Sequence, residues 1–210
     1  MLVTSPNYTL RLMRPPSYPS DLLPLMSQLD TAGVAIEYVF HEGSPTTDSF
    51  ARHRTAAIEG MEEIARRLDH RPIDGAPAES SLDLHFHVRW DLATLSGKPV
   101  SFGEFWGIDD VKPRATSKYA SSLPEVNGYK SAFFLPPYGL RGSIEAQSAL
   151  FAAINLEVFG SDMAQSEIFA WSTNWSNYFD AGHEWWGAFY WTVLPAGSNR
   201  MVTIGASSTD

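Results

Sequence analysis

The clearest alternation of apolar and polar residues covers residues 82–92. Apolar side chains occupy every even position of this stretch, and charged or titratable side chains occupy every odd position. Successive side chains of a strand point to opposite faces, so the pattern predicts a strand with one buried face and one wet face. Residues 100–108 are expected to form its hairpin partner. Further strands are predicted at residues 7–14, 34–40, 129–135 and 166–173.

Apolar residues at helical spacing predict helices at residues 20–31, 47–70 and 143–159. In the longest of the three, Ala57, Met61 and Ile64 follow one another at intervals of three or four residues. Ser20 and Ser143 suit the N-caps of the outer two helices, and Gly160 suits a C-terminal stop.

Aromatic residues concentrate in residues 169–193, which hold five of the chain's 7 tryptophans. The sequence predicts a strand at 184–194, joined as a hairpin to a strand at 201–205. Large rings would then lie on both faces of the first strand. That strand is therefore either buried on both faces or open on one face as a ring platform for a ligand. The predicted ligand- or partner-binding residues are Trp171, Trp175, Trp185, Trp186 and Tyr190, together with Arg114 from a small basic group in the loop at 109–127.

The order of these elements favours an α+β fold, with a mainly antiparallel mixed sheet and two to three helices packed on one face. Helices do not alternate with strands after residue 92, and no glycine-rich phosphate loop is present, which argues against a dinucleotide-binding fold. We expect one domain over residues 1–210, with lobes at 1–75 and 80–210 around a linker at 74–81. The aromatic hairpin is expected to pair with the 82–92 strand.

Composition limits the classes of function. The net charge is −9 with a pI near 5.1, and cysteine is absent. Acidity opposes nucleic-acid binding and favours a basic partner. Without cysteine there are no disulfides or thiolate zinc sites, and neither a signal peptide nor a membrane-spanning stretch is recognisable. These features predict a cytoplasmic protein that does not bind membranes or nucleic acid.

His85 and His87 would project from the same face of the 82–92 strand, because they are two residues apart. Such a pair can supply two ligands to a divalent metal, with Asp180, His183 and Glu184 completing a nitrogen and oxygen site. The competing interpretation is a solvated sheet face that happens to carry two histidines.

The short segment from Asp180 to Glu184 is also a candidate general acid–base site. A carboxylate beside tryptophan can have its pKa raised by desolvation, and Glu184 precedes Trp185. The simpler alternative is that Asp180 and Gly182 only form the turn into the next strand.

Three functional hypotheses follow. The first is a non-catalytic acidic binding protein without a cofactor, similar in composition to the small neutralising proteins that bind basic toxins or enzymes. The second is a metal-assisted hydrolase that uses the histidine and carboxylate residues. The third is a binder of sugars or nucleotide-like ligands on the aromatic face.

Overall fold

The protein is represented by a computed structural model that describes residues 18–43, 47–68, 87–107 and 127–207. Its centre is a five-stranded antiparallel sheet with the strand order β1-β5-β4-β3-β2. The strands are β1 (Ile36–Glu42), β2 (Gly97–Pro99), β3 (Glu167–Trp171), β4 (Phe189–Leu194) and β5 (Arg200–Ala206). The α-helices are α1 (Leu23–Ala32), α2 (Ser49–Leu68), α3 (Phe102–Trp106), α4 (Tyr129–Phe134), α5 (Ile144–Phe159) and α6 (Asp180–Trp185). Antiparallel pairing throughout this sheet, together with these helices, confirms the predicted α+β class.

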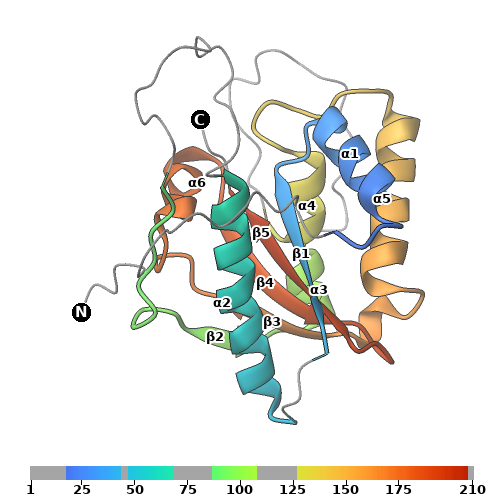
Figure 1. The fold of residues 1–210 in the computed structure, drawn as a ribbon. Helices are drawn as coiled ribbons and strands as arrows, with labels where there is room; N and C mark the ends of the chain where they lie inside the picture. The colour runs from blue at the N-terminus through green and yellow to red at the C-terminus, as the bar shows by residue number, and fades with distance from the viewer. Residues whose placement is uncertain (1–17, 44–46, 69–86, 108–126, 208–210) are drawn as a thin grey trace.

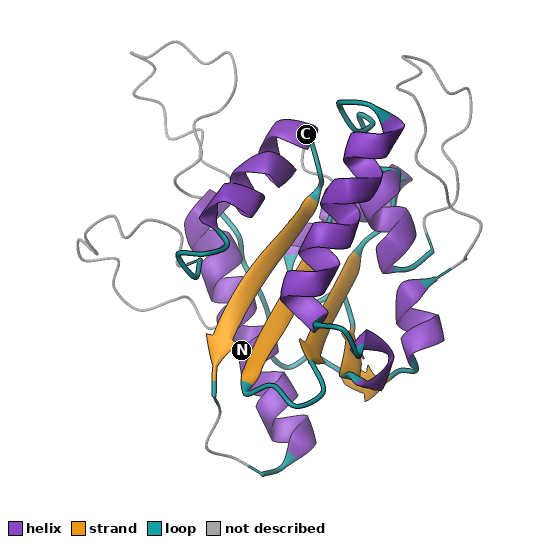
Figure 2. Ribbon diagram, turned by 90° about the vertical axis from the view of Figure 1, so that its right-hand side faces the viewer, coloured by secondary structure: helices purple, strands orange, loops and turns teal. Residues whose placement is uncertain are grey.

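Helices pack on one face of the sheet as expected, and α2 covers the other face (Figures 1 and 2). Alternate side chains of β5 point into the layers on the two faces of the sheet. Val202 and Ile204 enter a cluster with α1, α4 and α5, whereas Thr203 bonds to the α2 backbone at Ala56. We call the first layer the α5 face and the second the α2 face.

Aromatic rings dominate the α5 face. Phe105 stacks on Tyr129 with ring centroids 5.0 Å apart, and it meets Trp191 edge to face at 5.3 Å. Phe133 and Phe151 lie 4.7 Å apart in the same cluster. Rings of this size remove large apolar areas from water, so this layer is the main hydrophobic core.

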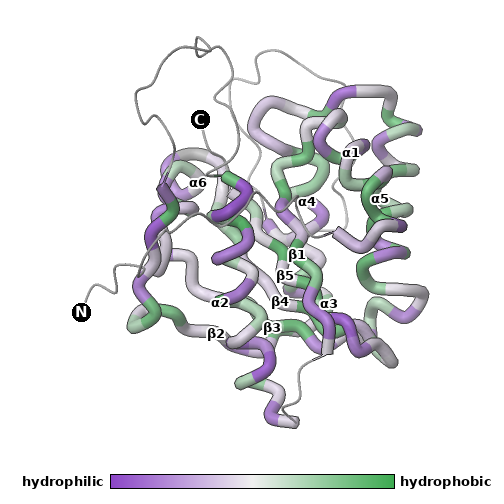
Figure 3. Tube along the Cα trace, viewed as in Figure 1, coloured by the Kyte–Doolittle hydropathy of each residue, from purple (hydrophilic) through white to green (hydrophobic). Residues whose placement is uncertain are grey.

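The α2 face is more polar. Figure 3 shows hydrophilic segments recurring along α2, whereas α5 is coloured hydrophobic over much of its length. The C-terminal half of α2 packs Met61 and Ile64 against Tyr178, Phe179 and Tyr190. The N-terminal half faces the sheet with hydrogen-bonding side chains instead.

The long helices and the C-terminal strands agree with the sequence predictions. Helices α1, α2 and α5 and strands β1 and β3 lie at the expected places, and β4 and β5 form the expected hairpin. Strand β4 begins only at Phe189, because residues 180–185 form α6 rather than a turn and the start of a strand.

Two predicted strands are helices. Residues 129–135 contain α4, in which Tyr129, Ala132 and Phe133 are fully buried, so burial all round the helix hides its period. Residues 100–108 contain α3, which starts with a capping box: Ser101 accepts from the Glu104 amide, and the Glu104 carboxylate accepts from the Ser101 amide.

The 82–92 strand prediction is also wrong in the part that is described. Residues 87–92 make one isolated bridge, Trp90 with Ser176, and do not pair with the aromatic hairpin. The Asn177 side chain binds the backbone on both sides of Val88, accepting from the Arg89 amide and donating to the His87 carbonyl. The sheet edge beside β3 is instead formed by β2. The predicted strand at 7–14 and linker at 74–81 lie outside the described residues.

Candidate functional site

Four of the five predicted aromatic ligand residues are buried in the two cores. Trp171, Trp175 and Tyr190 lie in the α2 layer, and Trp186 lies in the α5 layer with its indole N–H donating to the Leu135 carbonyl at 2.6 Å. None of these four residues is more than 6% exposed. Their rings therefore pack the protein interior and offer no open ring face. Trp185 belongs to α6. Arg114 lies outside the described residues.

The predicted acid–base residues share one turn of α6. Asp180, His183 and Glu184 are all exposed, and His183 Nε2 lies 2.7 Å from the Thr173 hydroxyl. The acid–base hypothesis required a carboxylate withdrawn from water. Because Glu184 is exposed, the structure does not withdraw this carboxylate from water.

The predicted metal pair is described only in part. His85 lies outside the described residues, and His87 is exposed. Within the described ranges no three or more histidine, aspartate or glutamate side chains gather closely enough to hold a metal ion.

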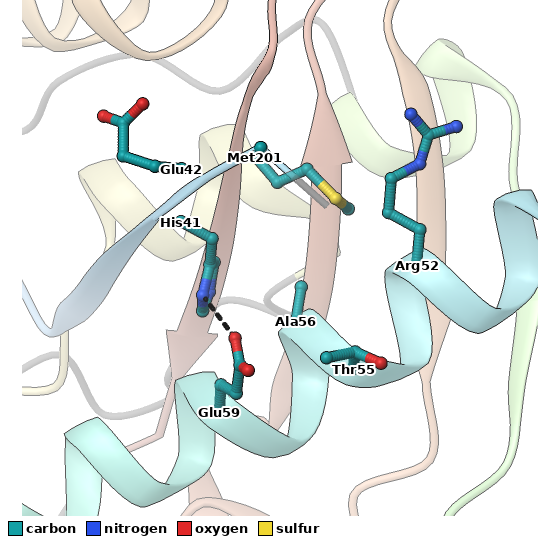
Figure 4. Close-up of a pocket in the computed structure, with 8 residues that line it drawn as sticks. His41, Glu42, Arg52, Thr55, Ala56, Glu59 and Met201 are labelled. Carbon is teal, nitrogen blue, oxygen red and sulfur yellow. Dashed lines mark ion pairs between the residues drawn. The ribbon is translucent and has the colours of Figure 1, made fainter. Parts of the chain in front are cut away.

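A hollow of about 130 Å³ opens between the N-terminal half of α2 and the edge of the sheet (Figure 4). We call it the α2 hollow. Its lining residues are His41, Glu42 and Gly43 at the end of β1, Met201 of β5, and Arg52, Thr55, Ala56 and Glu59 of α2.

Helical spacing explains how α2 contributes four of these residues. Arg52, Thr55, Ala56 and Glu59 stand at intervals of three, four and seven from the first, so they lie along one side of the helix. His41 reaches the same layer because it is two residues beyond Val39 of β1, whose side chain packs in the α2 core.

The hydrogen bonds of Thr203 fix the tautomer of His41. The Thr203 hydroxyl donates its single proton to the Ala56 carbonyl at 2.9 Å. It must therefore accept from His41 Nε2, which is 2.8 Å away. Burial, assisted by the positive charge of Arg67, lowers the pKa of His41 to about 4, so the ring is neutral at pH 7. Its Nδ1 is then a bare acceptor.

That bare nitrogen faces a carboxylate. His41 Nδ1 lies 3.5 Å from Glu59 Oε2 across the hollow, and Figure 4 shows the two side chains directed toward one another. Glu59 remains 58% exposed. Two acceptors at this distance do not stabilise each other unless one donor or cation contacts both of them.

The other charges around the hollow already have partners. The Glu42 carboxylate lies 3.2 Å from Arg200 Nε, and the Arg52 guanidinium lies 3.9 Å from Glu167 Oε2. In Figure 4 the Arg52 guanidinium and the Glu42 carboxylate both point away from the His41–Glu59 pair.

A second buried histidine extends this polar region toward β3. His53 is fully buried, and its Nδ1 lies 2.7 Å from the Thr192 hydroxyl, which accepts from the Trp171 indole at 2.9 Å. Burial lowers the pKa of His53 to about 4. His53 Nε2 has no hydrogen-bond partner and lies 3.8 Å from the Glu167 carboxylate, which accepts a hydrogen bond from Ser49.

The sequence predictions missed both histidines. His53 sits inside the predicted helix at 47–70, and His41 directly follows the predicted strand at 34–40. The polar partners of both are distant in the chain. The available signal was weak: His41 ends an apolar strand, and His53 stands within the apolar period of α2.

No protein-family model, curated protein or solved structure matches the chain. Among the described helices, none combines the length and the apolar character needed to cross a bilayer.

Proposed function

We propose that this chain is a cytoplasmic, non-catalytic binding protein that holds a basic protein partner by charge complementarity. The observation that carries the proposal is the imbalance of exposed charge in the described residues. Exposed cationic side chains there are Arg89, Lys98 and Arg141. Exposed carboxylates are Asp21, Asp30, Glu42, Asp48, Glu59, Glu62, Glu104, Glu145, Glu157, Asp162, Asp180 and Glu184.

This imbalance extends over several elements. The exposed carboxylates are carried by α1, α2, α3, α5 and α6 and by the ends of strands and loops, in a chain whose net charge is −9. A surface of one dominant sign attracts oppositely charged proteins and speeds their association. The same surface repels nucleic acid and acidic proteins.

The finer form of the proposal is a neutralising, immunity-like role. A folded acidic protein can inhibit a basic enzyme or toxin by covering the cationic surface with which that partner meets its own substrate. Packing of both faces of the sheet by buried clusters supports such a role, because a preorganised surface loses little conformational entropy on binding.

The proposal is tested by reconstitution with an identified partner. A partner found by cross-linking in cells would be purified, and binding would be measured by calorimetry at several salt concentrations. We expect a stoichiometric complex with a protein of high pI. Raising the salt from about 50 to 300 mM should weaken it at least about tenfold, because exposed charges are screened. For the neutralising role, one equivalent should abolish the partner's own activity.

Matched charge variants sharpen this test. Neutralising Glu157, Asp162, Asp180 and Glu184 together removes four exposed negative charges. Association should slow about tenfold. Replacing the exposed cations Arg89, Lys98 and Arg141 by glutamine should have the opposite effect. Association rates that do not depend on salt or on these variants would contradict the proposal, as would a partner that is itself acidic.

A further inference from the structure

The α2 hollow contains an electrostatic mismatch that a ligand would resolve. His41 is held by Thr203 with its proton on Nε2, so its Nδ1 lone pair faces the Glu59 carboxylate at 3.5 Å. A group that donates to both acceptors and carries a positive charge would turn this repulsion into two favourable contacts.

We propose that the α2 hollow is a socket for the ammonium group of a lysine side chain on the partner protein. This inference rests on the proposed function, since a basic protein supplies the lysine. An ammonium has three donors on one compact nitrogen, so it can serve His41 Nδ1 and Glu59 together. The third donor would remain directed to solvent, because the Thr55 hydroxyl points away from His41 and Glu59 in Figure 4.

The size and charge of the hollow fit this ligand. Its volume of about 130 Å³ accommodates an ammonium and the end of its aliphatic stem. Ala56 and Met201 line the hollow beside the polar groups and can contact the methylene groups of the stem. Arg52 does not occupy the position, because its guanidinium is directed to Glu167.

Other ligand classes fit less well. A metal ion would need a third ligand, and no such group of three is found among the described residues. An anion would be repelled by the negative charge of the Glu59 carboxylate, which lines the hollow. A neutral ligand would leave the charge of Glu59 uncompensated.

The test uses a lysine side chain detached from any partner. Nα-acetyl-lysine methylamide is titrated into the intact protein, and backbone amide shifts of α2 and β1 are followed by NMR at constant ionic strength. We expect saturable shifts around Glu59 and His41, with a dissociation constant of about 1–10 mM, as befits one partly exposed charge-assisted contact. The Nε-acetylated form of the probe, which lacks the charge, should give no saturable shift. The arginine analogue should bind more weakly, because its planar guanidinium is broader than the compact ammonium and fits a hollow of about 130 Å³ less well.

Two matched variants locate the binding. Glu59→Gln should weaken binding of the lysine probe about tenfold, which is the usual effect of losing a charge-assisted hydrogen bond. Glu62→Gln removes another exposed charge from the same helix outside the hollow, and it should change binding less than about twofold. Circular dichroism would verify that both variants fold.

The possible failures can be told apart. Equal weakening by Glu59→Gln and Glu62→Gln, or shifts that never saturate, would show diffuse attraction to an acidic surface and overturn the socket. If the basic partner then still binds in a salt-dependent manner, the proposed function stands without the socket. If the lysine probe binds as expected but no basic partner forms a complex, the socket stands as a site for a free amine and the proposed function fails.

Discussion

The two faces of the sheet are packed by different chemistry. On the α5 face, aromatic rings such as Phe105, Tyr129 and Phe151 contact one another over a broad apolar layer. On the α2 face, hydrogen bonds join the N-terminal half of the helix to the sheet: His53 pairs with Thr192, and the Thr203 hydroxyl donates to the Ala56 carbonyl. Thr203 also accepts from His41 of the neighbouring strand β1. The first layer relies on area removed from water, and the second on the direction of individual hydrogen bonds.

This difference explains how α2 is positioned. Hydrophobic contacts do not depend on direction, so they tolerate sliding of a helix along a sheet. Thr192 and Thr203 stand opposite each other on β4 and β5, and they bond to His53 and to the Ala56 carbonyl of α2. These two bonds fix α2 along and across the strands. The α2 hollow exists because α2 is fixed in that position.

The largest effect should come from truncating a ring on the α5 face. Phe133 is fully buried and lies 4.7 Å from Phe151 and 5.2 Å from Phe134, measured between ring centroids. We expect Phe133→Ala to lower the free energy of unfolding by about 3–5 kcal/mol, because it loses transfer free energy and leaves a cavity. Urea denaturation followed by tryptophan fluorescence measures this change. Tyr138, which is 76% exposed, is the control, and Tyr138→Ala should cost less than about 0.5 kcal/mol. Equal costs at the two positions would contradict the assignment of the main core to this face.

The second effect is a dependence on pH that belongs to the α2 face. The pKa values of His41 and His53 are lowered to about 4 in the folded protein, chiefly by burial, against 6.5 for a free histidine. Below pH 6.5 the unfolded chain therefore binds protons that the folded chain does not, and the free energy of unfolding falls until the pH passes about 4. Between these two pH values, each histidine lowers the free energy of unfolding by about 1 kcal/mol for every unit that the pH falls.

Variants separate this slope from the titration of carboxylates. His53→Gln and His41→Gln should each reduce the slope of the free energy of unfolding between pH 4.5 and 6.5 by about 1 kcal/mol per pH unit. A core variant of the other face, Phe133→Leu, should shift the whole curve downward without changing its slope. Unchanged slopes in both glutamine variants would show that the buried imidazoles are not the groups responsible.

The same contrast decides how much of the fold could be predicted. The long helix α2 is visible in the sequence because its apolar residues lie along one buried side. The short helix α4 is buried on all sides, so its sequence carries no period that separates helix from strand. Helix α3 was readable in principle from the Ser101-to-Glu104 capping box, which is a local signal.

The candidate site was not predictable in the same way. Its two acceptors, His41 and Glu59, come from different elements and meet only because α2 crosses the sheet at one position. The sequence indicates candidate residues by the chemistry of their side chains, and it does not show which of them are buried. Trp171, Trp175 and Tyr190 are predicted from the sequence as ligand-binding rings, but in the fold they pack in the core of the α2 face.

A substitution at Gly60 tests how closely α2 approaches the sheet. A β-carbon added at Gly60 would stand 2.6 Å from the Thr203 methyl group and 2.7 Å from its hydroxyl. Thr203 cannot easily move, because its hydroxyl is bonded to both Ala56 and His41. In an exposed helix, alanine is favoured over glycine by about 1 kcal/mol, but here we expect Gly60→Ala to lower stability by about 1–3 kcal/mol through overpacking. Gly103 of α3 provides the control, since an added β-carbon there meets nothing within 4 Å and Gly103→Ala should be neutral or stabilising. Thermal unfolding of the two variants measures whether each substitution raises or lowers the stability of the protein. If Gly60→Ala stabilised the protein as much as Gly103→Ala, the helix could be lifting from the sheet without cost, and the hydrogen bonds of the α2 face would not fix its position.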